Sequence, residues 1–208
     1  MKNLLIIFIA LICFSGISQT QYEKGMQKAL DLWNTEKPSE AINLFERIAI
    51  AEPDEWLPPY YASLINVLNG FGEKDEAKLT AQQEKAMEFL INAKAISKDN
   101  AELLLLEALW YTVWVAYDGA QYGMKYGAKV SQIYQEAFAL SPNSPRVILN
   151  KAEWDMGGAR FFGQPITPFC KDIKRAIELF ADFKPEGKFY PSYGLERAKQ
   201  VLVENCNN

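Results

Sequence analysis

The chain has 208 residues, of which 49% are hydrophobic and 23% charged, a composition typical of a folded globular protein. Its 26 acidic residues outnumber its 22 basic ones, and a polyanion binder would normally show a basic stripe, so nucleic acid is not an expected partner. The chain contains no histidine. This excludes the commonest general base, the Ser/His and Cys/His nucleophile systems and most catalytic zinc sites.

Residues 1–18 have the form of a secretory signal peptide. Lys2 precedes an apolar run of eleven residues, and the small residues Gly16 and Ser18 follow, two positions apart. The run is too short to cross a ~30 Å hydrocarbon core, which takes roughly 20 residues. We therefore expect a signal at 1–18 that is removed and one domain at 19–208, which is exported to the periplasm or secreted and has no stable membrane insertion.

One spacing pattern recurs four times, with steps of 45, 44 and 46 residues between copies. Each copy has a small residue (valine in the third), a large apolar residue four positions later, another apolar residue three beyond it, and proline or lysine after five more. Positions 0, 4 and 7 share one face of a helix, and proline ends a helix. The copies span 41–53, 86–98, 130–142 and 176–188. Each is preceded by a second apolar segment with helical spacing, at 22–33, 57–68, 103–117 and 146–155.

Capping and breaking residues predict where several helices begin and end. Pro38 and Ser39 are placed to begin one helix, Asp99 or Asn100 stands before Ala101, and Ser144 precedes Pro145. Glycines at 70–72 and 157–158 are predicted to end two first helices. No segment is typical of a strand. We therefore expect four antiparallel helix pairs and a closing helix at 193–204.

These residues resemble tetratricopeptide repeats. Ala108 and Tyr111 match the first-helix motif, and the series at 41–53 and 130–142 match the second. The resemblance covers residues 22–204 and implies an all-α, right-handed solenoid of helical hairpins. The 45-residue step is longer than the usual 34, so a HEAT-like solenoid is the alternative. The segments after residue 142 also resemble uncharacterised exported proteins of Bacteroidetes-type bacteria, which implies a location and a fold but no activity.

Two cysteines, Cys170 and Cys206, remain after removal of the signal. An even pair in an exported chain is typical of a disulfide. Cys170 begins the last repeat helix and Cys206 ends the closing helix, and these two ends lie side by side in an antiparallel hairpin. We therefore predict a structural disulfide between them, with two free thiols as the alternative.

The segment from Tyr117 to Tyr126 is the first candidate binding site. It is rich in glycine and tyrosine, and we expect a turn there that exposes Tyr117, Asp118, Tyr122 and Tyr126. The neighbouring Trp110 and Trp114 have helical spacing and are predicted to belong to the core.

The second candidate is a predicted loop at 157–168 that carries Arg160 and Gln164. Its alternative is structural, with Phe161 and Phe162 folding back against the last two repeats.

Paired carboxylates such as Glu102 and Glu107, or Glu153 and Asp155, are expected on solvated helix faces rather than in a catalytic site. We expect no metal, no cofactor and no enzymatic activity. Helical solenoids bind partners on the concave face lined by the first helix of each pair. The expected function is a scaffold or adaptor for a cell-envelope protein, and a small-ligand or glycan-binding protein is the alternative. The sequence predicts no oligomeric state.

Overall fold

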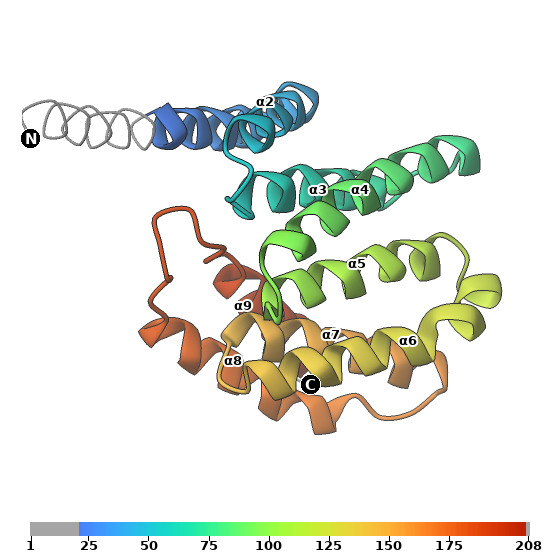
Figure 1. The fold of residues 1–208 in the computed structure, drawn as a ribbon. Coiled ribbons are helices and arrows are strands. Elements are labelled where there is room, and N and C mark those ends of the chain that lie inside the picture. Colours follow the sequence, from blue (N-terminus) through green and yellow to red (C-terminus); the bar gives the residue numbers. More distant parts are fainter. Residues whose placement is uncertain (1–20, 207–208) are drawn as a thin grey trace, which may run out of the picture.

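The computed structural model describes residues 21–206, which form stacked helical hairpins (Figure 1). The predicted signal at 1–18 lies outside these residues. A helix at 21–34 is followed by α2 (Pro38–Ala51), α3 (Leu57–Gly70), α4 (Glu76–Ile96), α5 (Ala101–Tyr117), α6 (Gly119–Leu140), α7 (Pro145–Phe161), η1 (Thr167–Phe169), α8 (Cys170–Asp182) and α9 (Leu195–Cys206). None of the described helices is both long and apolar enough to cross a membrane.

The predicted all-α architecture is confirmed. α3 pairs with α4, α5 with α6 and α7 with α8, and α9 packs on α8. The helix at 21–34 packs on α2, since Met26 and Ala29 are buried in one cluster with Ala41 and Phe45. The first position of every repeat copy is fully buried: Ala41, Ala86, Val130 and Ala176 have no exposed surface. The first position of each repeat copy is therefore one at which the second helix of the pair is fully packed in the core.

The buried small positions of the repeat give a test of this register. We expect Ala41→Leu and Ala137→Leu each to lower the free energy of unfolding by about 1–3 kcal/mol, because both side chains are fully buried and leave no room for extra methylenes. Urea unfolding measures the loss. Ala139→Leu is the matched control, because Ala139 is exposed on the same helix as Ala137. An unchanged midpoint in both core variants would contradict the register.

The predicted helix starts are confirmed by their caps. Asn100 accepts a hydrogen bond from the backbone N–H of Glu102 at 2.9 Å, and Ser144 accepts one from Val147 at 3.3 Å. α2 and α7 begin at prolines, as the sequence indicates. Proline suits a first turn because its missing N–H would have no helical partner there.

Two predicted irregular segments are helical, one at 119–126 and the other in its first part, 157–161, and both errors have the same reason. Residues 119–126 belong to α6, not to a turn, and the Asp118 carboxylate begins that helix by accepting from the N–H of Gln121 at 3.0 Å. Gly157 and Gly158 lie inside α7, which continues to Phe161. Glycine weakens a helix but does not end it when packing supports the segment.

The end of α7 is instead set by Gly163, whose φ is +65°. The backbone N–H of Gly163 donates to the carbonyl of Arg160, and that of Gln164 donates to Ala159 at 2.7 Å. This double pattern is a Schellman motif, which favours glycine in the left-handed conformation.

After α8 the chain runs back toward the N-terminal hairpins through residues 183–194, which we call the return segment (Figure 1). Phe189 is buried in the same core as Tyr22 and Tyr61, and its carbonyl accepts a hydrogen bond from the Tyr61 hydroxyl at 2.8 Å. Tyr190 packs edge-on against Trp56. The last part of the chain therefore closes against the first.

The predicted disulfide is confirmed. Cys170 and Cys206 are bonded, and their Cα atoms lie 5.7 Å apart. The bond joins the start of α8 to the end of α9 and so holds the C-terminal helix against the last hairpin.

Candidate functional site

A large apolar cavity of about 1730 Å³ lies along the first helices of the last three pairs. The solenoid geometry predicts this concave face as the binding face. The cavity is lined by α3, α5 and α7, by α6 as far as Tyr134, by the segment after α7 and by the chain entering α9. Its principal apolar lining residues are Leu64, Leu68, Phe71, Leu105, Leu106, Leu109, Val115, Ala116, Ala120, Ala128, Leu149, Pro165 and Phe169.

α5 is apolar on both of its faces, and the two faces have different roles. Leu105, Leu109 and Ala116 recur at helical spacing and line the cavity. Trp110 and Trp114 lie on the other face, where the Trp110 indole N–H donates to the carbonyl of Gln83 in α4 at 2.8 Å. These two tryptophans pack against the neighbouring pair, as the sequence predicts.

Three hydrophobic side chains stand exposed where the cavity opens. Met124 on α6 is 93% exposed, and Phe161 and Phe162 at the end of α7 are 70% and 74% exposed. The alternative in which the two phenylalanines fold back as a plug is therefore wrong. Large exposed apolar groups beside an apolar cavity indicate a binding surface rather than part of the core.

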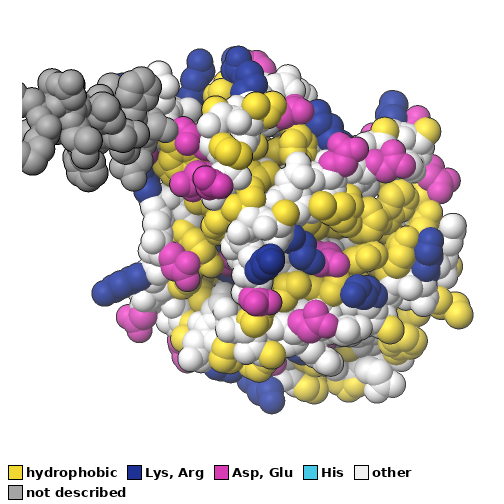
Figure 2. Space-filling view, in the orientation of Figure 1, with side chains coloured by type: hydrophobic (Ala, Val, Ile, Leu, Met, Phe, Trp, Pro, Cys, Tyr) yellow, Lys and Arg dark blue, Asp and Glu magenta, His cyan; other side chains and the backbone are white. Residues whose placement is uncertain are grey.

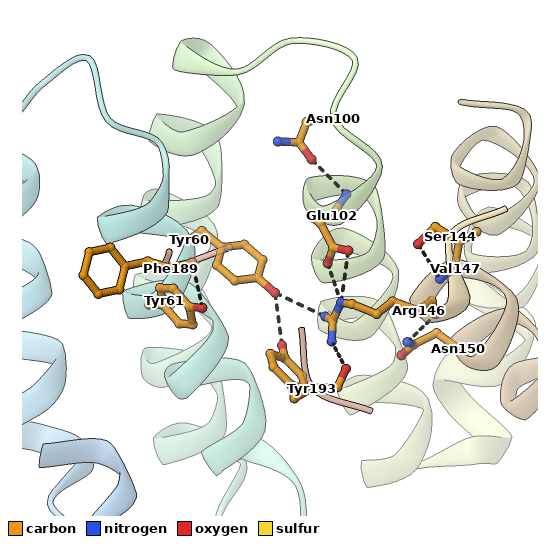
Figure 3. A network of polar contacts seen from close by, with 10 residues as sticks. All are labelled: Tyr60, Tyr61, Asn100, Glu102, Ser144, Arg146, Val147, Asn150, Phe189 and Tyr193. Atoms are coloured by element: carbon orange, nitrogen blue, oxygen red, sulfur yellow. Dashed lines mark hydrogen bonds and ion pairs between the residues drawn. The ribbon is translucent and has the colours of Figure 1, made fainter. Parts of the chain in front are cut away.

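Three residues that line the cavity, Tyr60, Arg146 and Tyr193, belong to a buried polar network (Figure 3). Arg146 of α7 is 5% exposed, and its Nε donates to both carboxylate oxygens of Glu102 in α5, at 3.0 and 2.8 Å. Its Nη1 donates to the carbonyl of Tyr193 at 2.8 Å, and its guanidinium lies 3.9 Å from the Tyr193 ring centroid. The hydroxyls of Tyr60 and Tyr193 lie 3.0 Å apart. The network thus joins three hairpins to the return segment.

Burial dominates the electrostatics of this network. It raises the pKa of Glu102, an effect that the neighbouring Arg146 opposes, and it raises the pKa of Tyr60 well above its usual range. Glu102 is 2% exposed, so the expectation that it lies on a solvated face was wrong. It serves to neutralise a buried arginine.

The other carboxylates of the two predicted pairs also have cationic partners. Glu107 binds Lys94, Glu153 binds Arg197, and Asp155 binds Lys151. Within residues 21–206, no three His, Cys, Asp or Glu side chains are grouped so that they could hold a metal ion.

The predicted aromatic site lies away from the cavity. Tyr122 is buried, its hydroxyl donates to Glu76 of α4 at 3.2 Å, and its ring stacks on Tyr126 with centroids 5.7 Å apart. Lys125 lies over both rings. Tyr117 ends α5 and Asp118 caps α6. Figure 2 shows hydrophobic side chains gathered between α4 and α6. None of the four predicted residues lines the cavity.

The second predicted site, at 157–168, lies partly in the cavity. Gln164 lines the cavity just beyond the exposed phenylalanines. Arg160 points away to the C-terminal helix, where it donates to the side chain of Asn205. Met124 was not predicted because its segment was assigned to a turn. The α5 leucines were not predicted because exposure cannot be read from a helical pattern that is apolar on both faces.

Comparisons with known proteins find similarity in structure but not in sequence. No family model matches the chain, and no curated protein matches it. The HusA haemophore from Porphyromonas gingivalis has a similar structure, with a TM-score of 0.76 and 21% identity over 89% of this chain and 92% of that one. A thermophilic TPR protein of Thermus thermophilus aligns over 88% of this chain and 99% of that one, with a TM-score of 0.39 and 16% identity. The helical-hairpin fold is thus shared with a haemophore.

Proposed function

We propose that the protein is exported and that its cavity binds a large, mostly apolar small molecule, with haem or a related tetrapyrrole as the first candidate. The observation that carries this proposal is the apolar cavity with Met124, Phe161 and Phe162 exposed at its opening. Export is supported by the signal-like residues 1–18 and by the disulfide. The tetrapyrrole class is suggested by the structural similarity to a haemophore.

The size and chemistry of the cavity favour such a ligand over a sugar. Sites for small molecules usually enclose about 300–1,000 Å³, and this cavity exceeds that range at about 1730 Å³. Its walls are mainly leucine, glycine, alanine and phenylalanine, which stabilise a ligand by burial of apolar surface, about 25 cal/mol per Å². The chain offers no histidine as an iron ligand, so we expect apolar contact to supply most of the affinity.

The first test is titration of the purified mature protein with haemin and with metal-free protoporphyrin IX, followed by visible absorbance. We expect saturable binding of both, because the lining supplies apolar contact rather than a histidine ligand. Phe161→Ser combined with Phe162→Ser is expected to weaken binding at least tenfold, which is about 1.4 kcal/mol. Circular dichroism checks that the variant is folded.

The matched control is Ile50→Ser combined with Ile91→Ser. Both isoleucines are exposed and neither lines the cavity, so we expect unchanged affinity. Equal weakening by the control pair would indicate nonspecific adsorption, and absence of saturable binding by the wild-type protein would refute the proposal for tetrapyrroles.

A protein partner on the same face is the second candidate, and the exposed side chains of Phe161 and Phe162 favour it. A scaffold would present an open groove with scattered polar groups, whereas this cavity is lined mainly by apolar side chains. A photo-crosslinking residue at position 162, used in the native cell envelope, distinguishes the two. Crosslinking to one protein that persists in excess porphyrin would support the scaffold.

A further inference from the structure

Three glycines follow one another along the cavity side of α6. Gly119, Gly123 and Gly127 are spaced by four residues, which places them on one stripe of the helix, and all three line the cavity. Gly157 and Gly158 line the same cavity from α7, which packs against α6. At these five positions two neighbouring helices present bare backbone to the cavity, beside lining side chains such as Ala120, Met124 and Ala128 of α6.

Neither packing nor backbone conformation requires these glycines. A Cβ atom built at any of the five would meet no atom within 4 Å outside its own helix backbone and chain neighbours. None of the five has a positive φ. Gly70 and Gly194 differ: a Cβ at Gly70 would lie 2.3 Å from the Gln83 amide nitrogen, and Gly194 has a φ of +126°. Glycine is the least favourable helix-interior residue after proline, so Gly123, Gly127, Gly157 and Gly158 weaken their helices and gain no packing contact in exchange, whereas Gly119 is the first residue of α6.

We expect the advantage of these glycines to lie in ligand binding. A side chain at 119, 123 or 127 would project into the space from which the ligand must contact α6. Glycine lets a ligand approach the helix backbone to van der Waals distance, about 3.5–4.0 Å between carbon atoms. The three glycines therefore leave the α6 backbone open along one stripe beside Ala120, Met124 and Ala128, whereas the α5 side of the cavity is formed by leucine side chains such as Leu105 and Leu109.

The polar side of the cavity supplies a second feature for the ligand. Arg146 lines the cavity and is almost completely buried. Its Nη1 and Nη2 each carry two N–H groups, and the hydrogen bonds described for them are one to the Tyr193 carbonyl and a long one of 3.4 Å to the Tyr60 hydroxyl. The guanidinium therefore has donor capacity beyond its internal bonds, which suits an acceptor on the edge of a ligand.

We propose that the α6 glycines determine the ligand class: the cavity selects a flat, rigid ring system that lies face-on against the backbone at Gly119, Gly123 and Gly127. This inference rests on the proposed function, because it takes the cavity to be the ligand site. It predicts that substitutions which stabilise the free protein at these positions weaken its binding of the ligand.

The test is the double variant Gly123→Ala and Gly127→Ala, measured without and with ligand. Without ligand we expect the melting temperature to rise by about 2–8 °C for the two substitutions together, since each replaces glycine by alanine in open space. With haemin and protoporphyrin IX we expect at least tenfold weaker binding. Gly157→Ala on α7 is a second variant with the same expected signs.

Two controls separate this effect from general changes in the helix. Asn92→Ala replaces an exposed residue of α4 outside the cavity, so it should raise the melting temperature slightly and leave porphyrin affinity unchanged. Palmitate, a flexible chain that can bend around a methyl group, is titrated calorimetrically against wild type and double variant. Palmitate should bind the double variant almost as tightly as it binds the wild-type protein.

The outcomes distinguish this inference from the function on which it rests. A wild-type protein that binds no porphyrin overturns both. Wild-type binding that survives unchanged in a more stable double variant overturns the role of the glycines alone. Equal losses for palmitate and porphyrin overturn the preference for flat rings.

Discussion

Replacing Arg146 by methionine is expected to lower the free energy of unfolding by about 3–5 kcal/mol, because it leaves the Glu102 carboxylate buried without its cation. The same change removes the hydrogen-bond donor of the Tyr193 carbonyl, which would weaken attachment of the return segment. Urea unfolding in the absence of ligand measures the loss.

A double variant separates the value of this ion pair from the cost of breaking it. Arg146→Met combined with Glu102→Leu removes both charges and keeps apolar volume, and such replacements are often neutral or stabilising. We therefore expect the double variant to recover much of the stability lost by Arg146→Met. The exposed pair Lys199 and Glu196 serves as a control, where Lys199→Met should change stability little. A loss of less than about 1 kcal/mol in Arg146→Met would show that the pair acts like a surface salt bridge.

Reduction of the disulfide is expected to have the second largest effect. The bond joins residues 36 apart in sequence, and closing a loop of this length contributes about 3–4 kcal/mol in the chain-entropy model. Thermal unfolding with and without a reductant measures the difference. Because Cys170 and Cys206 are the cysteines of residues 19–208, reductant has no other disulfide to act on within that chain.

Hydrogen exchange locates this effect. We expect the amides of α9 to lose protection first, since α9 packs mainly on α8 beside the bond. Cys206→Ser should reproduce the effect of the reductant. An unchanged melting temperature, with reduction verified by mass, would show that packing of Ala198 and Val201 alone holds α9 in place.

The fold could be predicted from the sequence because packing imposes a period on it. The fully buried Ala41 and Ala176, 135 residues apart, belong to one series that only helical packing explains. The errors lie at Gly119, Gly123 and Gly157, where glycine indicated a turn by its intrinsic preference. Tertiary packing overrides that preference, and the sequence does not show which neighbours supply it.

The site could be predicted only in part. The concave face of the first helices was expected, but Leu109 and Trp110 are both apolar neighbours on α5, and nothing local shows which one faces the cavity. Tyr122 and Tyr126 appeared exposed because they were assigned to a turn. On a helix they contact each other, and the Tyr122 hydroxyl reaches Glu76 of α4. The return segment has no helical period, so its contact with Tyr61 could not be expected.

The return segment also constrains how this chain can be made and how it can evolve. In an ordinary repeat array each unit contacts only its neighbours, so units can fold one by one and can be gained or lost. Here Phe189 fills part of the core that begins at Tyr22, so the N-terminal hairpin is incomplete until nearly the whole chain is present. Folding of that hairpin is therefore completed only in the finished polypeptide. A fifth hairpin inserted in the stack would carry residues 183–194 out of reach of Tyr61, so the number of repeats is fixed by the length of the segment that closes them.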